Sequence, residues 1–210
     1  MTLPVRSRTL LHPDGAERVE HSIRCPERRA TVALGTCERC PASTGVFEGP
    51  RVGTFVVDCD FEPPAASSSD LLERPVGELA STDVVCALPE TTAQRAQHTL
   101  RERAIGCLPI VDEHRNVRGL VSPADLLAAA PEARLDSLMT KQVVTFTEEV
   151  PLARAAATLA FEGIHHAPLV DENGKLIGVL SSLDILRAIG EQGRYMVPRE
   201  TRRQRAPRED

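Results

Sequence analysis

Four cysteines in the first third of the chain have a spacing that suits metal binding. They follow the pattern C-x11-C-x2-C-x18-C, and they are Cys25, Cys37, Cys40 and Cys59. A C-x2-C pair places two thiolates on one tight turn, and four thiolates complete a tetrahedral site. The pattern favours a structural zinc ion, with a single iron ion as the alternative because it takes the same donors. A dithiol switch at the close pair and a coincidental cluster stay open.

A second group of residues with possible chemistry is the motif G-x-x-S-x-x-D. It occurs at Gly119, Ser122 and Asp125, and again at Gly178, Ser181 and Asp184. One interpretation is purely structural, since a Ser followed three residues later by an acidic residue caps a helix N-terminus. Pro123 suits the first helical position. The other interpretation is a ligand site, because free N–H groups at a helix N-terminus bind phosphate. The glycines would then let a ligand approach the backbone.

Both motifs belong to an ungapped internal repeat. Residues 76–128 align with residues 135–187 at a constant offset of 59, and seventeen positions are identical. Self-similarity of this kind indicates two copies of one structural unit. The predicted strands are residues 83–88, 107–113 and 117–122 in the first copy, and 142–147, 166–172 and 176–181 in the second. The predicted helices begin at Ala93 and Leu152, and cover residues 123–130 and 182–189.

The predicted order in each copy is therefore β-α-β-β-α, which gives an α+β fold. One unit of about 55 residues buries too little surface to be stable alone. We expect the two copies to pack sheet to sheet about a pseudo-twofold axis, with a shared core and two symmetric clefts. The pair Asn173 and Gly174 predicts a hairpin turn in the second copy.

The residues PIVDE or PLVDE followed by G-x-x-S-x-x-D, after a helix and in duplicate, resemble the cystathionine-β-synthase (CBS) domain pair, or Bateman module. The resemblance covers about residues 75–190. It implies that the clefts bind AMP, ADP, ATP or S-adenosylmethionine, and that occupancy regulates a partner, here a protein in trans. It also implies a homodimer.

The resemblance assigns a nucleotide-binding role to residues of both copies. Asp125 and Asp184 would bind ribose, Ser122 and Ser181 would bind phosphate, and the first two strands of each copy would contact adenine. The full set is Val84, Val85, Cys107, Pro109, Gly119, Ser122, Asp125, Val143, Val144, His166, Pro168, Gly178, Ser181, Asp184 and Arg187. Arg187 stands where the first copy has Ala128, which favours tighter phosphate binding in the second cleft.

The organisation predicted for the chain has five parts. They are a four-cysteine metal-binding β module similar to a zinc ribbon or rubredoxin (1–62), a linker that allows relative motion (63–74), CBS domain 1 (75–131), CBS domain 2 (132–190) and a disordered tail (191–210). Two further cysteines, Cys86 and Cys107, are predicted to be small core or cleft-lining residues.

Composition excludes several functions. The net charge is −5, aromatic residues make up 3%, and residues 1–62 carry eight Arg against nine acidic residues, so nucleic-acid binding is not expected. No apolar run approaches the ~18–20 residues that span a bilayer, and we expect a cytoplasmic protein. No catalytic triad, phosphate loop or paired catalytic carboxylates occur, so we predict no enzyme. Two alternatives stay open: a rubredoxin-like iron redox protein with a CBS scaffold, and a structural adaptor with empty clefts.

Overall fold

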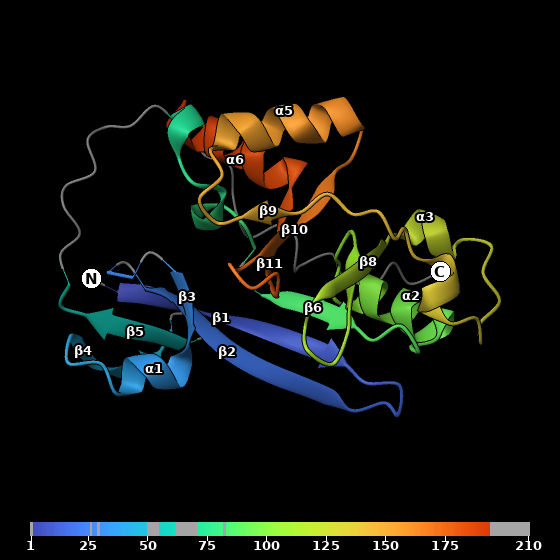
Figure 1. The fold of residues 1–210 in the computed structure, drawn as a ribbon, viewed down its shortest axis with the longest axis horizontal. Coiled ribbons are helices and arrows are strands. Elements are labelled where there is room, and N and C mark those ends of the chain that lie inside the picture. The colour runs from blue at the N-terminus through green and yellow to red at the C-terminus, as the bar shows by residue number, and fades with distance from the viewer. Residues whose placement is uncertain are drawn as a thin grey trace, which may run out of the picture.

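The computed structural model describes residues 2–25, 27–28, 30–49, 55–61, 71–81 and 83–193. These residues form an N-terminal β unit and two repeats, which stand at the lower left, the right and the top of Figure 1. The N-terminal β unit contains β1 (Thr2–Leu11), β2 (Glu17–Cys25), β3 (Ala30–Ala33), α1 (Leu34–Glu38), β4 (Ser43–Glu48) and β5 (Phe55–Cys59).

Both repeats have the predicted order β-α-β-β-α. The first contains β6 (Val84–Ala87), α2 (Ala93–Glu102), β7 (Leu108–Val111), β8 (Val117–Val121) and α3 (Pro123–Leu126). The second contains β9 (Phe146–Thr147), α5 (Leu152–Glu162), β10 (His166–Val170), β11 (Leu176–Ser181) and α6 (Ser182–Gln192). Short helices precede each repeat: η1 (Leu71–Glu73) and η2 (Val76–Glu78) before the first, and α4 (Leu135–Leu138) before the second.

Two elements are shorter than predicted. The first strand of the second repeat was expected over residues 142–147, but only Phe146 and Thr147 pair with a neighbouring strand. The last helix of the first repeat was expected over residues 123–130 and covers only Pro123–Leu126, whereas its counterpart α6 has 11 residues. The hairpin turn of the second repeat is confirmed, since Gly174 has a φ of +77° and donates its N–H to the carbonyl of Asp171.

The two repeats exchange the segments that lead into them. The segment before β6 packs on the second repeat, where Ser81 forms a bridge with Val179. The segment before β9 packs on the first repeat, where Thr140 forms the equivalent bridge with Leu120. Val76 is accordingly buried in the core of the second repeat and Leu135 in that of the first. Neither repeat therefore completes its core from its own residues.

A pseudo-twofold axis relates the repeats, as predicted. Asn116 forms a bridge with Lys175, and these two residues are counterparts at the repeat offset of 59. A contact between counterparts is possible only close to the axis that exchanges them. The sheets of the two repeats therefore meet at this axis, and their outer faces are covered by α2 and α3 on one side and by α5 and α6 on the other (Figure 1).

The N-terminal β unit is joined to the first repeat through β1. The C-terminal half of β1 pairs in parallel with β6, from Arg8 beside Val84 to Leu11 beside Ala87. The N-terminal half pairs with β5, and β2 follows the other edge of β1. Figure 1 shows β1 and β2 running from the N-terminal β unit to the edge of β6. The resulting sheet has eight strands, and the pairing of β1 with β6 was not predicted from the sequence.

Buried charges also hold the N-terminal β unit against the second repeat. Arg6 of β1 donates to Glu148 Oε1 at 2.5 Å and to the carbonyl of Gly77 at 2.6 Å, and Arg6 and Glu148 are 7% and 6% exposed. Arg24 of β2 lies 2.8 Å from the other oxygen of Glu148. The expected relative motion of this unit is therefore not supported, because movement would separate a buried ion pair and a strand ladder.

Parts of the predicted linker and tail are structured. Residues 71–73 form η1, and Leu71 is buried in the core of the second repeat. The last helix continues through Gln192, two residues into the predicted tail. The predictions for residues 63–70 and 194–210 fall outside the described residues.

Candidate functional site

Side chains of the first strands divide between two environments. Val84 is buried in a cluster with Leu176 of the second repeat, so it faces the surface between the repeats. Val85 packs instead into the helix-covered core of the first repeat, and Val144 does the same in the second. In the first repeat this division follows from the alternation of side chains along β6. Only one of each predicted valine pair therefore directs its side chain toward a cleft between the repeats.

Both Ser-x-x-Asp motifs form helix caps. At the start of α6, the N–H and Oγ of Ser181 donate to Asp184 Oδ2 at 2.9 and 2.6 Å. At the start of α3, Ser122 makes the same two contacts with Asp125 Oδ2, at 2.7 and 2.6 Å. The capping interpretation is thus confirmed, with Pro123 at the first turn. One oxygen of each carboxylate is fully used within the protein.

The second oxygen of the carboxylate distinguishes the two caps. Arg187 donates to Asp184 Oδ1 at 3.3 Å, and both side chains are mostly buried. The backbone N–H of Ser182, next in the first turn of α6, donates to the carbonyl of His165. Ala128 stands at the position of Arg187 in the first repeat. The cap of the second repeat therefore combines a carboxylate with a cation, and that of the first does not.

Exchanged segments lie near both motif glycines, but only Gly119 is in close contact with one. A Cβ on Gly119 would lie 2.5 Å from the sulfur of Met139, in the exchanged segment that leads to the second repeat. A Cβ on Gly178 would lie 3.6 Å from the carbonyl oxygen of Ser81, in the other exchanged segment. These glycines were predicted to admit a ligand. In the structure their neighbours are the exchanged segments.

His165, just before β10, and His166, its first residue, point to different places. The ring of His166 crosses to the first repeat, where a Cβ on Gly106 would lie 2.6 Å from its Nε2. His165 is exposed, and its Nδ1 lies 3.5 Å from the hydroxyl of Ser182. The pair therefore does not form a common ligand site.

An open cavity of about 410 Å³ lies between the repeats. Its lining residues come from the β7–β8 turn of the first repeat and from the first strand region and β10–β11 turn of the second: Asn116, Val117, Lys141, Val143, Thr145, Val170 and Gly174. Of the predicted site residues, Val143 alone lines it. Lys141 and Thr145 were missed, although Lys141 is one of only two lysines in the chain. The volume lies in the range of small-molecule sites.

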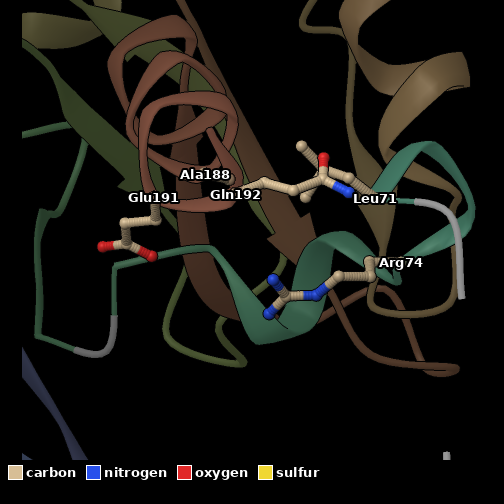
Figure 2. Close-up of a pocket in the computed structure, with 5 residues that line it drawn as sticks. All are labelled: Leu71, Arg74, Ala188, Glu191 and Gln192. Atoms are coloured by element: carbon tan, nitrogen blue, oxygen red, sulfur yellow. The ribbon is translucent and has the colours of Figure 1, made fainter. Parts of the chain in front are cut away.

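A second hollow of about 340 Å³ lies outside the repeat interface. It is lined by Leu71, Arg74, Ala188, Glu191 and Gln192. Figure 2 shows Arg74 beside η1, opposite Glu191 and Gln192 on α6. Arg74 already pairs with Glu78 at 3.2 Å. None of the predicted ligand-binding residues lines this hollow.

The two cysteines of the first repeat are core residues, as predicted. Cys86 is completely buried and Cys107 is 5% exposed. Burial raises the pKa of each thiol to about 12. Both thiols are therefore protonated and chemically inert at neutral pH.

The four N-terminal cysteines gather at one end of the N-terminal β unit. Burial raises the pKa of the Cys37 thiol, and the thiols of Cys25, Cys40 and Cys59 raise it further. The chain turns between the close pair, where the N–H of Cys40 donates to the carbonyl of Cys37. Among the described residues, however, no group of three or more His, Cys, Asp or Glu side chains is arranged to hold a metal ion. The predicted zinc or iron site is not supported, and Cys37 and Cys59 pack in an apolar cluster.

No helix in the described ranges is both long and apolar enough to cross a bilayer.

The comparisons with known proteins concern the two repeats. A family model described as "CBS domain" matches residues 76–132 and again residues 135–191. An uncharacterised 17.7 kDa protein of Acidianus ambivalens is 31% identical over 118 residues, which are 54% of this chain and 72% of that protein. An uncharacterised protein of Methanopyrus kandleri is 33% identical over 119 residues, which are 53% of this chain and 61% of that protein.

Some relatives have enzyme names, but the likeness covers only a small part of them. The homoserine O-acetyltransferase of Methanosalsum zhilinae is 27% identical over 117 residues. That stretch is 55% of this chain and 24% of the enzyme. The likeness therefore concerns the duplicated region and carries no activity to this chain.

Two similar solved structures contain adenosyl compounds. The CBS domain pair of protein MJ0100, in complex with 5′-methylthioadenosine and S-adenosyl-L-methionine, is 28% identical with a TM-score of 0.53. The aligned region covers 56% of this chain and 97% of the MJ0100 chain. CBSX2 in complex with AMP is 26% identical with a TM-score of 0.54, and covers 57% of this chain and 98% of that chain.

Proposed function

The chain belongs to the CBS domain family, and we propose that it is a regulatory protein that binds an adenine nucleotide or S-adenosylmethionine between its two repeats. The observation that carries the proposal is the cavity of about 410 Å³, which takes its walls from both repeats. The similar pairs in complex with AMP or with S-adenosyl-L-methionine support the ligand class. A ligand between the repeats would bind one relative position of the two repeats more tightly than another. Regulation requires such a difference in affinity between two states of the protein.

The two Ser-x-x-Asp caps are the proposed ribose and phosphate contacts. In each cap the carboxylate presents one oxygen, Oδ1, that the serine does not use. Ribose hydroxyls would donate to this oxygen, and Arg187 beside Asp184 would attract phosphate in the second repeat. No catalytic role is proposed, and the regulated activity would reside in a separate protein.

A homodimer is part of the proposal. Large apolar side chains are exposed on or next to the helices, and two of them, Leu127 just after α3 at 88% and Leu186 of α6 at 61%, are counterparts in the two repeats. Phe161 at the end of α5 is 89% exposed. Equivalent apolar positions on both helix-covered faces support association with a second copy.

A metal-based redox function has less support. It rests on the gathering of Cys25, Cys40 and Cys59 around Cys37. The donor arrangement of the described residues does not favour it. Metal analysis of the purified protein tests the alternative directly: iron at one ion per chain, lost in a Cys37→Ser variant, would reinstate it, whereas zinc is redox-inert and would not.

Calorimetric titration with AMP, ADP, ATP and S-adenosylmethionine tests the proposed function. We expect micromolar binding of at least one of them, and a loss of at least about tenfold in affinity in the Asp125→Asn, Asp184→Asn double variant. Asp136→Asn, at a partly exposed position outside the caps, is the control and should bind normally. Failure of all four compounds to bind would contradict the proposal and favour the adaptor with empty clefts.

A further inference from the structure

The two clefts beside the pseudo-twofold axis are equivalent in sequence position and different in content. The cavity is one of them. At the repeat offset of 59, its apolar lining has counterparts on the other side of the axis: Val143 corresponds to Val84, Thr145 to Cys86, Val170 to Val111, and Val117 to Leu176.

The counterpart cleft is filled. Val84, Cys86, Val111 and Leu176 form one buried cluster, and none of them is more than 3% exposed. Leu10 of β1 packs against this cluster. On the open side, by contrast, Thr145 is exposed and the three valines are only half-buried. A side chain from outside the repeats, Leu10, thus packs against the buried cluster together with Val117 and Val179.

The backbone shows the same difference. Residues 84–87 pair with β1 along its C-terminal half. In the part of the chain that the structure describes, no strand pairs with residues 143–145, although their sequence was expected to form one. Val143 and Thr145 of this segment line the open cavity, and backbone groups that no strand pairs with require other partners, such as solvent or a ligand.

Polar contacts hold β1 in the filled cleft. The guanidinium of Arg8 donates to the carbonyl of Leu176, whose counterpart is the cavity residue Val117. Arg8 also pairs with Glu20 of β2, and Glu20 lies 2.8 Å from Arg115 of the β7–β8 turn. The occupant therefore supplies an apolar group and a hydrogen-bond donor directed at a backbone carbonyl.

We propose that β1 is a built-in occupant of the cleft beside β6, so that the protein binds a single adenosyl ligand, in the cleft lined by Val143, Thr145 and Lys141. The inference rests on the proposed function for its ligand class. An adenine ring with its exocyclic amino group supplies what β1 supplies on the other side, an apolar surface and a donor for a backbone carbonyl. Lys141 at the rim adds a cation for phosphate.

Titration of the full-length protein with AMP and with ATP tests the single site. We expect one ligand per chain. Thr145→Trp, at an exposed position, should fill the cavity and weaken binding by at least about tenfold. Lys141→Ala should weaken ATP binding by about fivefold, the upper range for an exposed ion pair. Lys175→Ala is the matched control, because Lys175 is the other lysine of the chain and does not line the cavity. The Lys175→Ala variant should bind ATP normally.

Hydrogen exchange on the same protein tests the occupant without any ligand. Amides of residues 84–87 should exchange slowly and those of residues 143–145 rapidly, and added nucleotide should protect only the second group. Two ligands per chain, or full affinity in Thr145→Trp, would overturn the inference and leave the proposed function intact. Equal rapid exchange in both segments would overturn it as well. If no nucleotide binds, the proposed function fails with the single site, while slow exchange at 84–87 still supports β1 as occupant.

Discussion

The first and second repeats have the same order of elements and the same caps, yet their first strands lie in opposite surroundings. β6 is an interior strand, because β1 covers the edge that faces away from β7. β9 is an edge strand of a three-stranded sheet, and its leading residues border a cavity. The comparison teaches that a duplicated sequence does not guarantee two equivalent sites. An element outside the duplication decides which site is open.

Thiol chemistry gives the largest expected difference between the two sides. Cys86 of β6 lies beside Leu10 of β1 in the sheet. Its thiol has a pKa of about 12, so about one Cys86 thiol in 10,000 is ionised at pH 8. A Thr145→Cys variant places a thiol at the equivalent exposed position, where the ordinary pKa of ~8.5 leaves about a quarter ionised. We expect the new thiol to react with a maleimide about a thousandfold faster, as read by mass spectrometry of the peptides. The reaction of Cys86 should rise only as pH approaches 12.

Comparable labelling rates for the two thiols at pH 8 would break the comparison. They would mean that β1 leaves β6 often enough to expose Cys86. Labelling of Cys107, which is buried away from the N-terminal β unit, serves as the internal standard for general unfolding.

The ion pair between the N-terminal β unit and the second repeat gives the second effect. Glu148 has no equivalent in the first repeat, where Pro89 stands at its position. Glu148→Ala leaves the cation of Arg6 buried without its carboxylate, and should lower the free energy of unfolding by about 3–5 kcal/mol. Urea denaturation measures this loss.

The control for that experiment is the neighbouring residue Glu149, which is exposed and pairs with Arg24 at 2.6 Å. Glu149→Ala should cost less than about 1 kcal/mol, since ion pairs at the surface contribute little. Equal losses in the two variants would show that β1 and β2 are not anchored to the second repeat through a buried charge.

The motif glycines give the smallest effect. Gly119→Ala would place a Cβ 2.5 Å from the Met139 sulfur and 3.0 Å from the carbonyl oxygen of Thr140, and should destabilise the protein by about 1–3 kcal/mol. Gly178→Ala meets its nearest atom, in Leu169, at 3.5 Å, and should be neutral within about 1 kcal/mol. Thermal unfolding of both variants measures the difference. A reversed order would mean that the exchanged segments pack differently from the structure.

Features carried by short stretches of sequence were predicted well. The caps at Ser122 and Ser181 depend on residues three positions apart, and the hairpin at Gly174 depends on a positive φ that glycine accepts. The β-α-β-β-α order follows from local hydrophobic periodicity, and the duplication doubled the signal for each element. These predictions succeeded because their physical causes lie within a few residues.

The shape of the candidate site was not predictable in the same way. Lys141 and Thr145 have no motif, and they line the cavity because the segment before β9 crosses to the first repeat. Gly119 was assigned to ligand contact, but its neighbour Met139 arrives through the same exchange. Contacts between distant segments depend on how complete cores fit together, and no local pattern encodes them.

Two homologous units, their caps and their membership of one family could be inferred from the sequence, because repetition and short-range stereochemistry depend on adjacent residues. That β1 joins the first repeat and leaves the second open is evident only in the folded chain. The physical reason lies in the alternation of β1, which directs Leu10 to the surface between the repeats, Leu11 to the core of the first repeat and Arg6 to Glu148. Side chains of β1 thus pack or pair in three separate environments, and only the folded chain brings those environments together.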